Sequence, residues 1–294
     1  MPVRKNILRL ILKWAIGAKV AIVASPMAFG QAQAGEQRSY TFAIVPQQAA
    51  TVLAASWGPV IKQVAGIVGP DLKFATTKDI PTFEACLAKG AYDFAYMNPY
   101  HYVTFNAKSG YRAFAREKDV SLTGLLVAHR SSSIRSLADL QQATIAFPSP
   151  AAFAATIIPR AELDRAGITY LASYVKSHDS VYLAVQNGLF PAGGGVRRTF
   201  ENMPPNVRDD LTVIFETAAY PAHAFAAHPS ISSQLTARIA AAMEALRDRE
   251  MFEPLGIKGF IGANDAEWNS IRALQIKQDQ SDIATAETES CPSG

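Results

Sequence analysis

From Tyr40 onward, β-rich runs alternate with segments whose apolar residues have helical spacing. Tyr40–Val45 is the first β-rich run, and it ends at Pro46. The segment after it places apolar residues three or four positions apart, on one face of a helix: Leu53, Trp57, Val60, Val64 and Ile67. Alternation of this kind predicts an α/β protein with layered, mostly parallel sheets.

The alternation continues to about residue 280. It predicts a short strand that ends at residue 75 and further strands at 92–97, 122–128, 144–147, 170–175 and 211–215. It also predicts a helix that begins at 98 and others at 82–89, 136–140, 151–166, 180–187, 231–246 and 265–278. Strands and helices thus alternate along the whole of this region.

A polar run, His129–Ser133, follows the strand at 122–128 and is a natural exit from a first lobe. The chain then returns to that lobe near Ala218–Ala227. We therefore predict a division of the chain into these parts: residues 35–128 and 218–280 as the first lobe, 129–217 as the second, and 281–294 as a disordered tail.

Two lobes joined by two crossings would place a cleft between them. Ligands of open α/β sheets bind beyond the carboxyl ends of the strands, often at helix N-termini. The loops after the predicted strands are therefore the expected site: residues 46–48, 76–80, 97–101, 148–154, 176–180 and 192–195.

The first 34 residues have the pattern of a cleavable signal peptide. Five basic and no acidic side chains open the chain, the apolar run Val20–Phe29 follows, and Ala32-Gln33-Ala34 offers a cleavage site. We expect cleavage after Ala34 and a periplasmic location. An amphipathic helix on a membrane surface is the alternative interpretation of this segment.

Removal of that segment changes the charge of the chain. The whole sequence has 28 basic and 25 acidic side chains, and the loss of five basic ones leaves 23 against 25. This near balance gives no indication of nucleic-acid binding. Cys86 fits a small core residue of the helix at 82–89, although a disulfide with Cys291 is allowed in an oxidising compartment.

Several short motifs resemble the phosphonate- and phosphite-binding periplasmic proteins of ABC transporters, the PhnD-like family. They extend over about 200 residues: Ile44-Val45-Pro46, Trp57-x-Pro59, Gly90 to Tyr96, Ser136 to Leu140, and Ser177-His178-Asp179. The resemblance implies a type II periplasmic-binding fold, with two α/β lobes around a hinge and a cleft. It also implies a receptor that captures a small solute for an ABC permease or, in some relatives, for a membrane sensor kinase.

The resemblance places a histidine and a tyrosine in the pocket, as His178 and Tyr96. In phosphonate binders, Ser and Thr hydroxyls open the helix that enters the second lobe, and this chain has Ala152-Phe153-Ala154 there. Only Ser149 and backbone amides remain as obvious donors, and Ile80 replaces an aromatic residue of the family. The loss of several charge-assisted hydrogen bonds predicts a small anion that is not clearly a phosphonate.

The candidate ligand-binding residues follow the predicted strands: Tyr96, Asn98, Tyr100, His101, Ser149, Phe153, His178 and Asp179. Each has a structural alternative. Asn98 could cap the next helix and Tyr100 could pack beneath it. Asp179 or Ser180 could cap the helix at 180–187, and Phe153 could be a packing residue. Gly193-Gly194-Gly195 allows either a close backbone approach or an ordinary loop.

Three other functions are weaker interpretations of the sequence. Ser177-His178-Asp179-Ser180 contains hydrolase residue types, but neighbouring residues do not normally converge into a triad, so we do not expect an enzyme. His101, His178 and His223 could hold a metal, although their spacing gives no support. Cys86 could bind arsenite. We expect no cofactor and a monomer.

Overall fold

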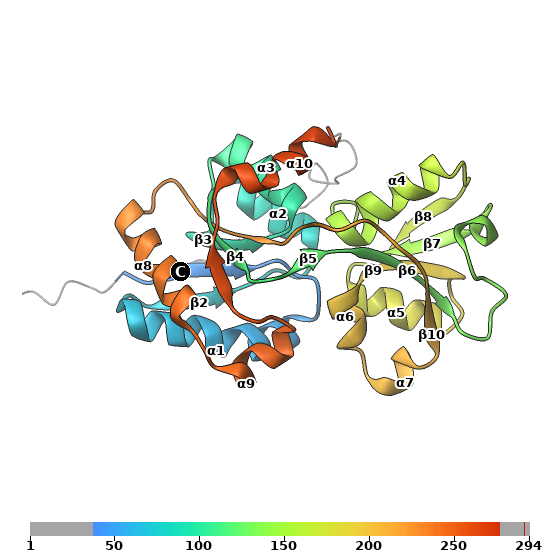
Figure 1. Cartoon of the computed structure of the whole chain (residues 1–294), viewed down its shortest axis with the longest axis horizontal. Coiled ribbons are helices and arrows are strands. Elements are labelled where there is room, and N and C mark those ends of the chain that lie inside the picture. Colours follow the sequence, from blue (N-terminus) through green and yellow to red (C-terminus); the bar gives the residue numbers. More distant parts are fainter. Residues whose placement is uncertain (1–37, 277–290, 292–294) are drawn as a thin grey trace, which may run out of the picture. The chain divides into compact units, whose positions relative to one another are not determined.

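The computed structural model describes residues 38–276 and Cys291 (Figure 1). The predicted signal peptide at 1–34 lies outside the described residues, as does the predicted tail at 281–294 apart from Cys291. Two main sheets and the helices that cover them make up the described part of the chain. The predicted two-lobed α/β fold is confirmed.

The first sheet has six strands in the order β13-β4-β12-β3-β1-β2. Their bounds are β1 (Tyr40–Ile44), β2 (Leu72–Ala75), β3 (Phe94–Met97), β4 (Arg112–Glu117), β12 (Ala224–Ala227) and β13 (Phe260–Gly262). Strand β1 runs parallel to β2 and β3, whereas β12 is antiparallel to β3 and β4, and β13 is antiparallel to β4.

The second sheet has five strands in the order β10-β6-β9-β7-β8. Their bounds are β6 (Gly124–His129), β7 (Thr144–Phe147), β8 (Leu171–Tyr174), β9 (Ala192–Val196) and β10 (Leu211–Glu216). Strand β7 is parallel to β8 and β9, and β6 is antiparallel to β9 and β10. Where the chain crosses between the sheets, β5 (Ser121–Leu122) pairs with β11 (Tyr220–Pro221).

The prediction of mostly parallel sheets is wrong, because both sheets are mixed. The strands that carry the chain from one sheet to the other, β6 and β12, run against the strands beside them. The strand that we predicted at 122–128 as the last of the first lobe also lies elsewhere than expected. Strand β6 belongs to the second sheet, so the crossing lies at β5. A run that is apolar on both faces has the same pattern in either sheet.

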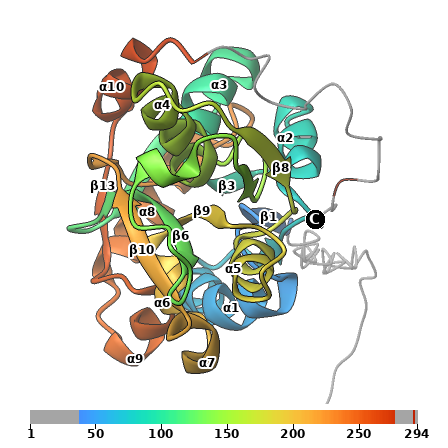
Figure 2. The same ribbon diagram turned by 90° about the vertical axis from the view of Figure 1, so that its right-hand side faces the viewer.

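The helices cover the faces of both sheets (Figures 1 and 2). Their bounds are α1 (Ala50–Val68), α2 (Ile80–Ala88), α3 (Pro99–Ser109), α4 (Ile158–Arg165), α5 (His178–Gln186), α6 (Arg197–Glu201), α7 (Pro205–Arg208), α8 (Ser233–Ala245), α9 (Arg249–Phe252) and α10 (Asn269–Ala273). Short 3₁₀ turns lie at Leu137–Leu140, Glu253–Leu255 and Asp265–Trp268. In the second lobe, α4 and α5 lie on opposite faces of the sheet (Figure 2).

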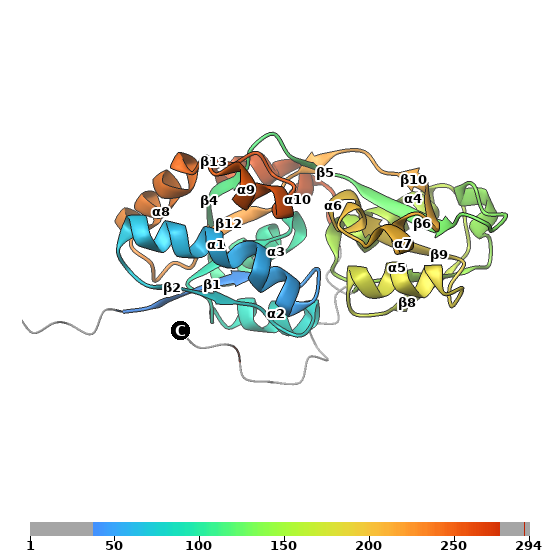
Figure 3. The ribbon, with the colours of Figure 1, turned by 90° about the horizontal axis from the view of Figure 1, so that it is seen from below.

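Helix α1 packs along β2 and α8, as Figure 3 shows. By length and composition alone it could cross a membrane, a test that core helices of soluble proteins also pass. Its buried face holds Leu53, Trp57, Val60, Ile61, Val64 and Val68. Ile67, which we predicted on that face, is 56% exposed. A face defined by 3.6 residues per turn continues from Val64 to Val68, one residue beyond the predicted position.

The continuous helix predicted at 151–166 begins differently. Phe153–Ile157 forms a π-helical turn, and α4 starts only at Ile158. Pro159 has no N–H to donate to the carbonyl of Ala155, which leaves the wide turn free to form. We call Ala152–Ile157 the wide turn.

Glycines let the wide turn lie directly on the second sheet. A Cβ at Gly194 of β9 would be 2.0 Å from the Ala155 carbonyl oxygen, and one at Gly124 of β6 would be 1.9 Å from that of Ala154. Both distances are far inside van der Waals contact. The glycine run therefore serves a close backbone approach, although it forms a strand where we had expected a loop.

Cys86 and Cys291 form a disulfide, with their Cα atoms 5.7 Å apart. Cys86 is a buried core residue, as predicted, but its sulfur is bonded to Cys291, so the preference for an unpaired cysteine and the arsenite interpretation are both wrong. The bond closes a separation of 205 residues and attaches Cys291 to α2. No local pattern predicts this pairing, because the two cysteines are 205 residues apart and only their number permits it.

Candidate functional site

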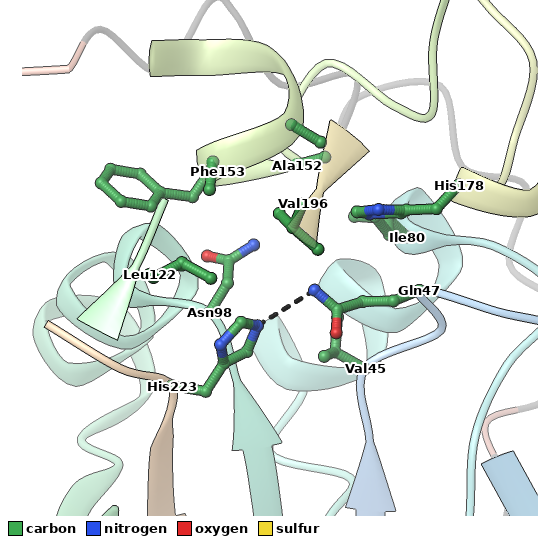
Figure 4. Close-up of a pocket in the computed structure, with 12 residues that line it drawn as sticks. Val45, Gln47, Ile80, Asn98, Leu122, Ala152, Phe153, His178, Val196 and His223 are labelled. Atoms are coloured by element: carbon green, nitrogen blue, oxygen red, sulfur yellow. Dashed lines mark hydrogen bonds between the residues drawn. The ribbon is translucent and has the colours of Figure 1, made fainter. Parts of the chain in front are cut away.

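A small cavity lies where the strands of the first sheet end and the wide turn begins (Figure 4). Its volume of about 10 Å³ is close to the space that one water molecule needs. Four of its lining side chains are polar, namely Gln47, Asn98, His178 and His223. The remainder are apolar: Val45, Ile80, Leu122, Val196 and the residues Ala152–Ala155.

The lining comes from both sheets. Gln47 follows β1, Asn98 follows β3, and His223 lies directly before β12. The second sheet contributes the end of β9 and the first residue of α5, His178. The cavity therefore lies beyond strand ends, as the general rule for open α/β sheets requires.

Asn98 caps a helix and contacts the other sheet at the same time. Its Oδ1 accepts a hydrogen bond from the His101 backbone N–H at 2.8 Å, which caps α3. Its Nδ2 donates to the carbonyl oxygen of Ala151, beside the wide turn, at 3.1 Å. Asn98 is therefore both the cap of α3 and a residue of the cavity wall. Sequence alone could not show the second bond, because it joins positions 53 residues apart.

His178 points into the cavity from the start of α5 (Figure 4). The side chain is buried, and its Nδ1 pairs with Thr199 Oγ1 at 3.1 Å. Its Nε2 has no hydrogen-bond partner among the residues that the structure describes. Burial, with a contribution from Arg198, lowers the pKa of His178 to about 3, so the ring is neutral at physiological pH. A buried polar atom without a partner is a candidate ligand contact.

Gln47 and His223 are linked in a defined orientation. Arg198 can only donate, so the oxygen it contacts at 3.2 Å must be the Gln47 Oε1. The Gln47 amide nitrogen then faces His223 Nε2, at 3.1 Å, and donates to it. Since Nε2 accepts, His223 carries its proton on Nδ1. Burial, and then the charge of Arg198, lowers the pKa of His223 well below 6.5, so this ring is neutral as well.

Tyr96 lies behind the cavity rather than in its wall. Its ring stacks on that of His223, with centroids 4.8 Å apart. Its hydroxyl donates to Glu117 at 2.7 Å and accepts from Arg198 at 2.9 Å. Burial raises the pKa of Tyr96 well above 10, which keeps the hydroxyl protonated. The structure thus gives Tyr96 a supporting position, one contact away from the lining residues.

Four other predicted site residues are buried or half-buried without lining the cavity: Tyr100, His101, Ser149 and Asp179. The His101 ring lies 3.5 Å from Glu84, and burial lowers the pKa of His101 to about 3. Ser149 Oγ has no partner within the described part of the chain. Asp179 accepts from the Ala49 backbone and the Gln48 side chain, while burial raises its pKa.

Phe153 does line the cavity, and its ring meets Tyr220 edge to face at 5.3 Å. Both interpretations of Phe153, as pocket wall and as packing residue, are therefore compatible with its position. The cap of α5 is neither Asp179 nor Ser180. Ser177 caps it, through a bond from the Ser180 N–H to Ser177 Oγ at 3.1 Å.

The sequence did not single out Gln47, Arg198 or Glu117. Gln47 falls within the predicted loop 46–48, and Arg198 follows the glycine run by three positions, so position alone could have drawn attention to them. Glu117 lies 81 residues from Arg198, and only the fold brings the two together.

The geometry does not favour the alternative chemistries. Within residues 38–276 and Cys291, no three His, Cys, Asp or Glu side chains gather in a way that could hold a metal. The side chains of Ser177 and His178 diverge, since Ser177 Oγ pairs with Ser180 and His178 Nδ1 pairs with Thr199. Polar groups that converge on a small enclosed space are typical of a binding site.

Comparison with known proteins identifies the family. Residues 42–268 match the family described as the ABC transporter, phosphonate, periplasmic substrate-binding protein. The chain belongs to this family. Its members are transport components that bind a small molecule in the periplasm for a membrane permease, so the predicted function is confirmed at that level.

Solved structures show the same fold. A binding protein component of an ABC phosphonate transporter from Pseudomonas aeruginosa has a TM-score of 0.75 at 18% identity, over 87% of this chain and 91% of that one. PhnD1 from Prochlorococcus marinus, in complex with methylphosphonate, has a TM-score of 0.77 at 16% identity, over 83% and 99%. A Xanthomonas citri protein bound to chloride scores 0.62 at 17% identity, over 80% and 95%.

Proposed function

We propose that this family member captures a small solute with a compact head that accepts hydrogen bonds, an oxyanion of low charge, and presents it to its ABC permease. The cavity that Gln47, Asn98, His178 and the wide turn enclose is the proposed site. Tyr96 and His101 support it through their contacts with His223 and Asn98, and we include the other candidates, Ser149, Tyr100 and Asp179, in the proposed site region.

The convergence of donors on one small space carries this proposal. The amide nitrogens of Gln47 and Asn98, each already bonded once, have a second hydrogen to donate. The unpartnered Nε2 of His178 donates in the tautomer whose Nδ1 accepts from Thr199, and the three groups come from separate loops. The first amides of a helical segment lack acceptors within it and favour negative charge, and Ala152–Ala155 form the start of such a segment.

The neutral lining limits the charge of the solute. None of the cavity-lining residues among those described is Lys, Arg, Asp or Glu, and burial keeps His178 and His223 uncharged. Hydroxyl side chains are absent from Ala152-Phe153-Ala154. Neutral donors can stabilise one negative charge, whereas a dianion in a buried site normally requires charge-assisted bonds.

Entry of the solute requires the two sides of the cavity to separate. A volume of about 10 Å³ does not hold an oxyanion, and two hydrogen bonds now cross the space: Asn98 to the Ala151 carbonyl and the His178 N–H to the Gln47 carbonyl at 3.2 Å. Motion about the crossings at β5 and β11 would open it.

We further propose that residues 1–34 direct export and are removed, and that the protein is a monomer.

A thermal-shift screen of the mature protein tests the proposal. The panel contains phosphite, methylphosphonate, methanesulfonate, formate, neutral amides and divalent metals. A compact monoanion should raise the melting temperature by mass action, because it binds the folded state alone. His178→Ala should lower the affinity for that anion by about tenfold to a hundredfold. His129→Ala, at the opposite end of β6 from the wide turn, should not.

The result that contradicts the proposal is stabilisation by a cation or a neutral solute alone. If His178→Ala and His129→Ala change anion binding equally, the proposal is also contradicted, because the binding site would then not be this cavity.

A further inference from the structure

Arg198 connects the two sheets beside the cavity. It lies in α6, immediately after β9 of the second sheet, and its guanidinium reaches only to the side of the first sheet. It donates to three acceptors there: Glu117 Oε1 at 2.5 Å, the Tyr96 hydroxyl at 2.9 Å and Gln47 Oε1 at 3.2 Å. Since Gln47 lines the cavity, Arg198 is one hydrogen bond away from a bound solute.

Glu117 is the partner that cancels this charge. It ends β4, its side chain is 1% exposed, and the Arg198 side chain is 22% exposed. Its Oε1 accepts from both Arg198 and the Tyr96 hydroxyl. An ion pair this close and this buried contributes almost no net charge to its surroundings, although either member alone would contribute strongly.

We propose that Arg198 and Glu117 determine how much charge the bound solute carries. Arg198 positions Gln47 when the sheets meet, and Glu117 neutralises Arg198, so that the closed site accepts a singly charged head and disfavours a doubly charged one. This proposal rests on the proposed function, since it assigns a charge class to the oxyanion.

The physical reason is a difference between the first and the second charge of the solute. Backbone and side-chain amide dipoles, with His178 in the tautomer that carries its proton on Nε2, stabilise the first charge. A second charge would require a nearby cation, and the guanidinium of Arg198 is already matched by the carboxylate of Glu117. In the orientation that Arg198 gives to Gln47, one amide hydrogen bonds to His223 and the amide has a second hydrogen to offer the solute.

Methanesulfonate and methylphosphonate provide matched probes, because they share one shape and differ by one charge when the phosphonate is fully ionised. Calorimetry at such a pH compares their affinities for the mature wild type and for Glu117→Gln and Arg198→Met. The wild type should bind methanesulfonate about tenfold more tightly. Glu117→Gln should move the ratio of the two affinities about tenfold toward methylphosphonate, and Arg198→Met should move it the other way.

The neighbouring ion pair provides the control. Arg197 and Glu216 lie within the second lobe, are partly exposed, and do not line the cavity. Glu216→Gln should leave the ratio unchanged. Because a ratio is measured within one protein, a general loss of stability affects both probes alike and cancels. Arg198→Lys, which keeps the charge and loses the planar fork, should weaken both probes and preserve the ratio.

Opposite shifts for the two variants support the proposal. An unchanged ratio in both, or a shift in the same direction, overturns it while the proposed function stands. Failure of both probes to bind any of these proteins contradicts the proposed function itself and, with it, the charge assignment. If Arg198→Met does not fold, the Glu117→Gln ratio alone decides, because that variant removes a charge and retains the side-chain volume.

Discussion

The first sheet contributes side chains to the cavity, whereas the second sheet contributes mainly backbone. Gln47, Asn98 and His223 are each held by side-chain hydrogen bonds, and a network that includes Tyr96 and Glu117 lies behind them. The facing wall is the wide turn, which lines the cavity with alanines and Phe153 and whose carbonyl groups lie against glycines of β6 and β9.

This difference separates two tasks of the site. Side chains on the first wall determine which polar groups face the cavity. The second wall depends on the position of a backbone turn, and that position depends on residues without a Cβ. His178 is the polar exception, since its imidazole faces the cavity from the backbone wall.

The largest expected effect comes from disturbing the backbone wall. Gly194→Ala would place a Cβ 2.0 Å from the Ala155 carbonyl oxygen, so the wide turn has to move. We expect a loss of about 3 kcal/mol in the free energy of unfolding, measured with urea, and loss of anion binding. Gly66→Ala, where nothing lies within 4 Å of the added Cβ, is the control: inside helix α1 it should raise the free energy of unfolding by about 1 kcal/mol and leave anion binding unchanged. A stable Gly194→Ala protein with normal binding would contradict the close-approach account.

Lowering the pH should have a smaller effect on the free energy of unfolding. His178, in the second wall, and His101, behind the first, each have a folded pKa of about 3, below the ordinary value of 6.5. The unfolded chain therefore takes up protons first, and stability that is full above pH about 6.5 declines as the pH falls toward 3. At pH about 5, each histidine should cost about 2 kcal/mol.

Urea unfolding at neutral and acidic pH measures that decline. His178→Gln and His101→Gln should each make the free energy of unfolding less sensitive to pH. If one of the two buried histidines has no effect on the pH dependence, then that wall of the site is more open to solvent than the structure indicates.

The smallest effect concerns the hydroxyls that the backbone wall lacks. Changing Ala152→Ser, Phe153→Thr and Ala154→Ser together should improve the affinity for methylphosphonate by about tenfold, through hydrogen bonds to a charged head. Loss of the Phe153 contact with Tyr220 should lower stability at the same time. Calorimetry that shows submicromolar methylphosphonate binding to the wild type would contradict the argument that these hydroxyls are required.

Sequence reasoning drew attention to part of the cavity lining through strand ends, a local property. Gln47, Asn98, Phe153 and His178 all fall in loops that the alternation of strands and helices predicted. The caps of α3 and the 3₁₀ turn at Leu137–Leu140 were equally local, since a cap depends on residues three positions apart.

The features that sequence reasoning missed depend on contacts between segments that are remote in the chain. The Arg198–Glu117 pair and the Cys86–Cys291 disulfide join positions that are 81 and 205 residues apart. The need for glycine in β9 becomes evident only when the wide turn is seen to lie against that strand. The register of β6 with the second sheet was likewise invisible, because a run buried on both faces has no alternation to assign it.

The most direct test of the central claim is a crystal structure of the mature protein with the panel anion that stabilises it most. The account predicts the anion between the two walls, with an oxygen within hydrogen-bond distance of His178 Nε2 and of the backbone amides of the wide turn. An anion bound anywhere else, such as the groove lined by Lys118, Arg247 and Lys258, with the cavity between Asn98 and His178 still closed, would contradict it.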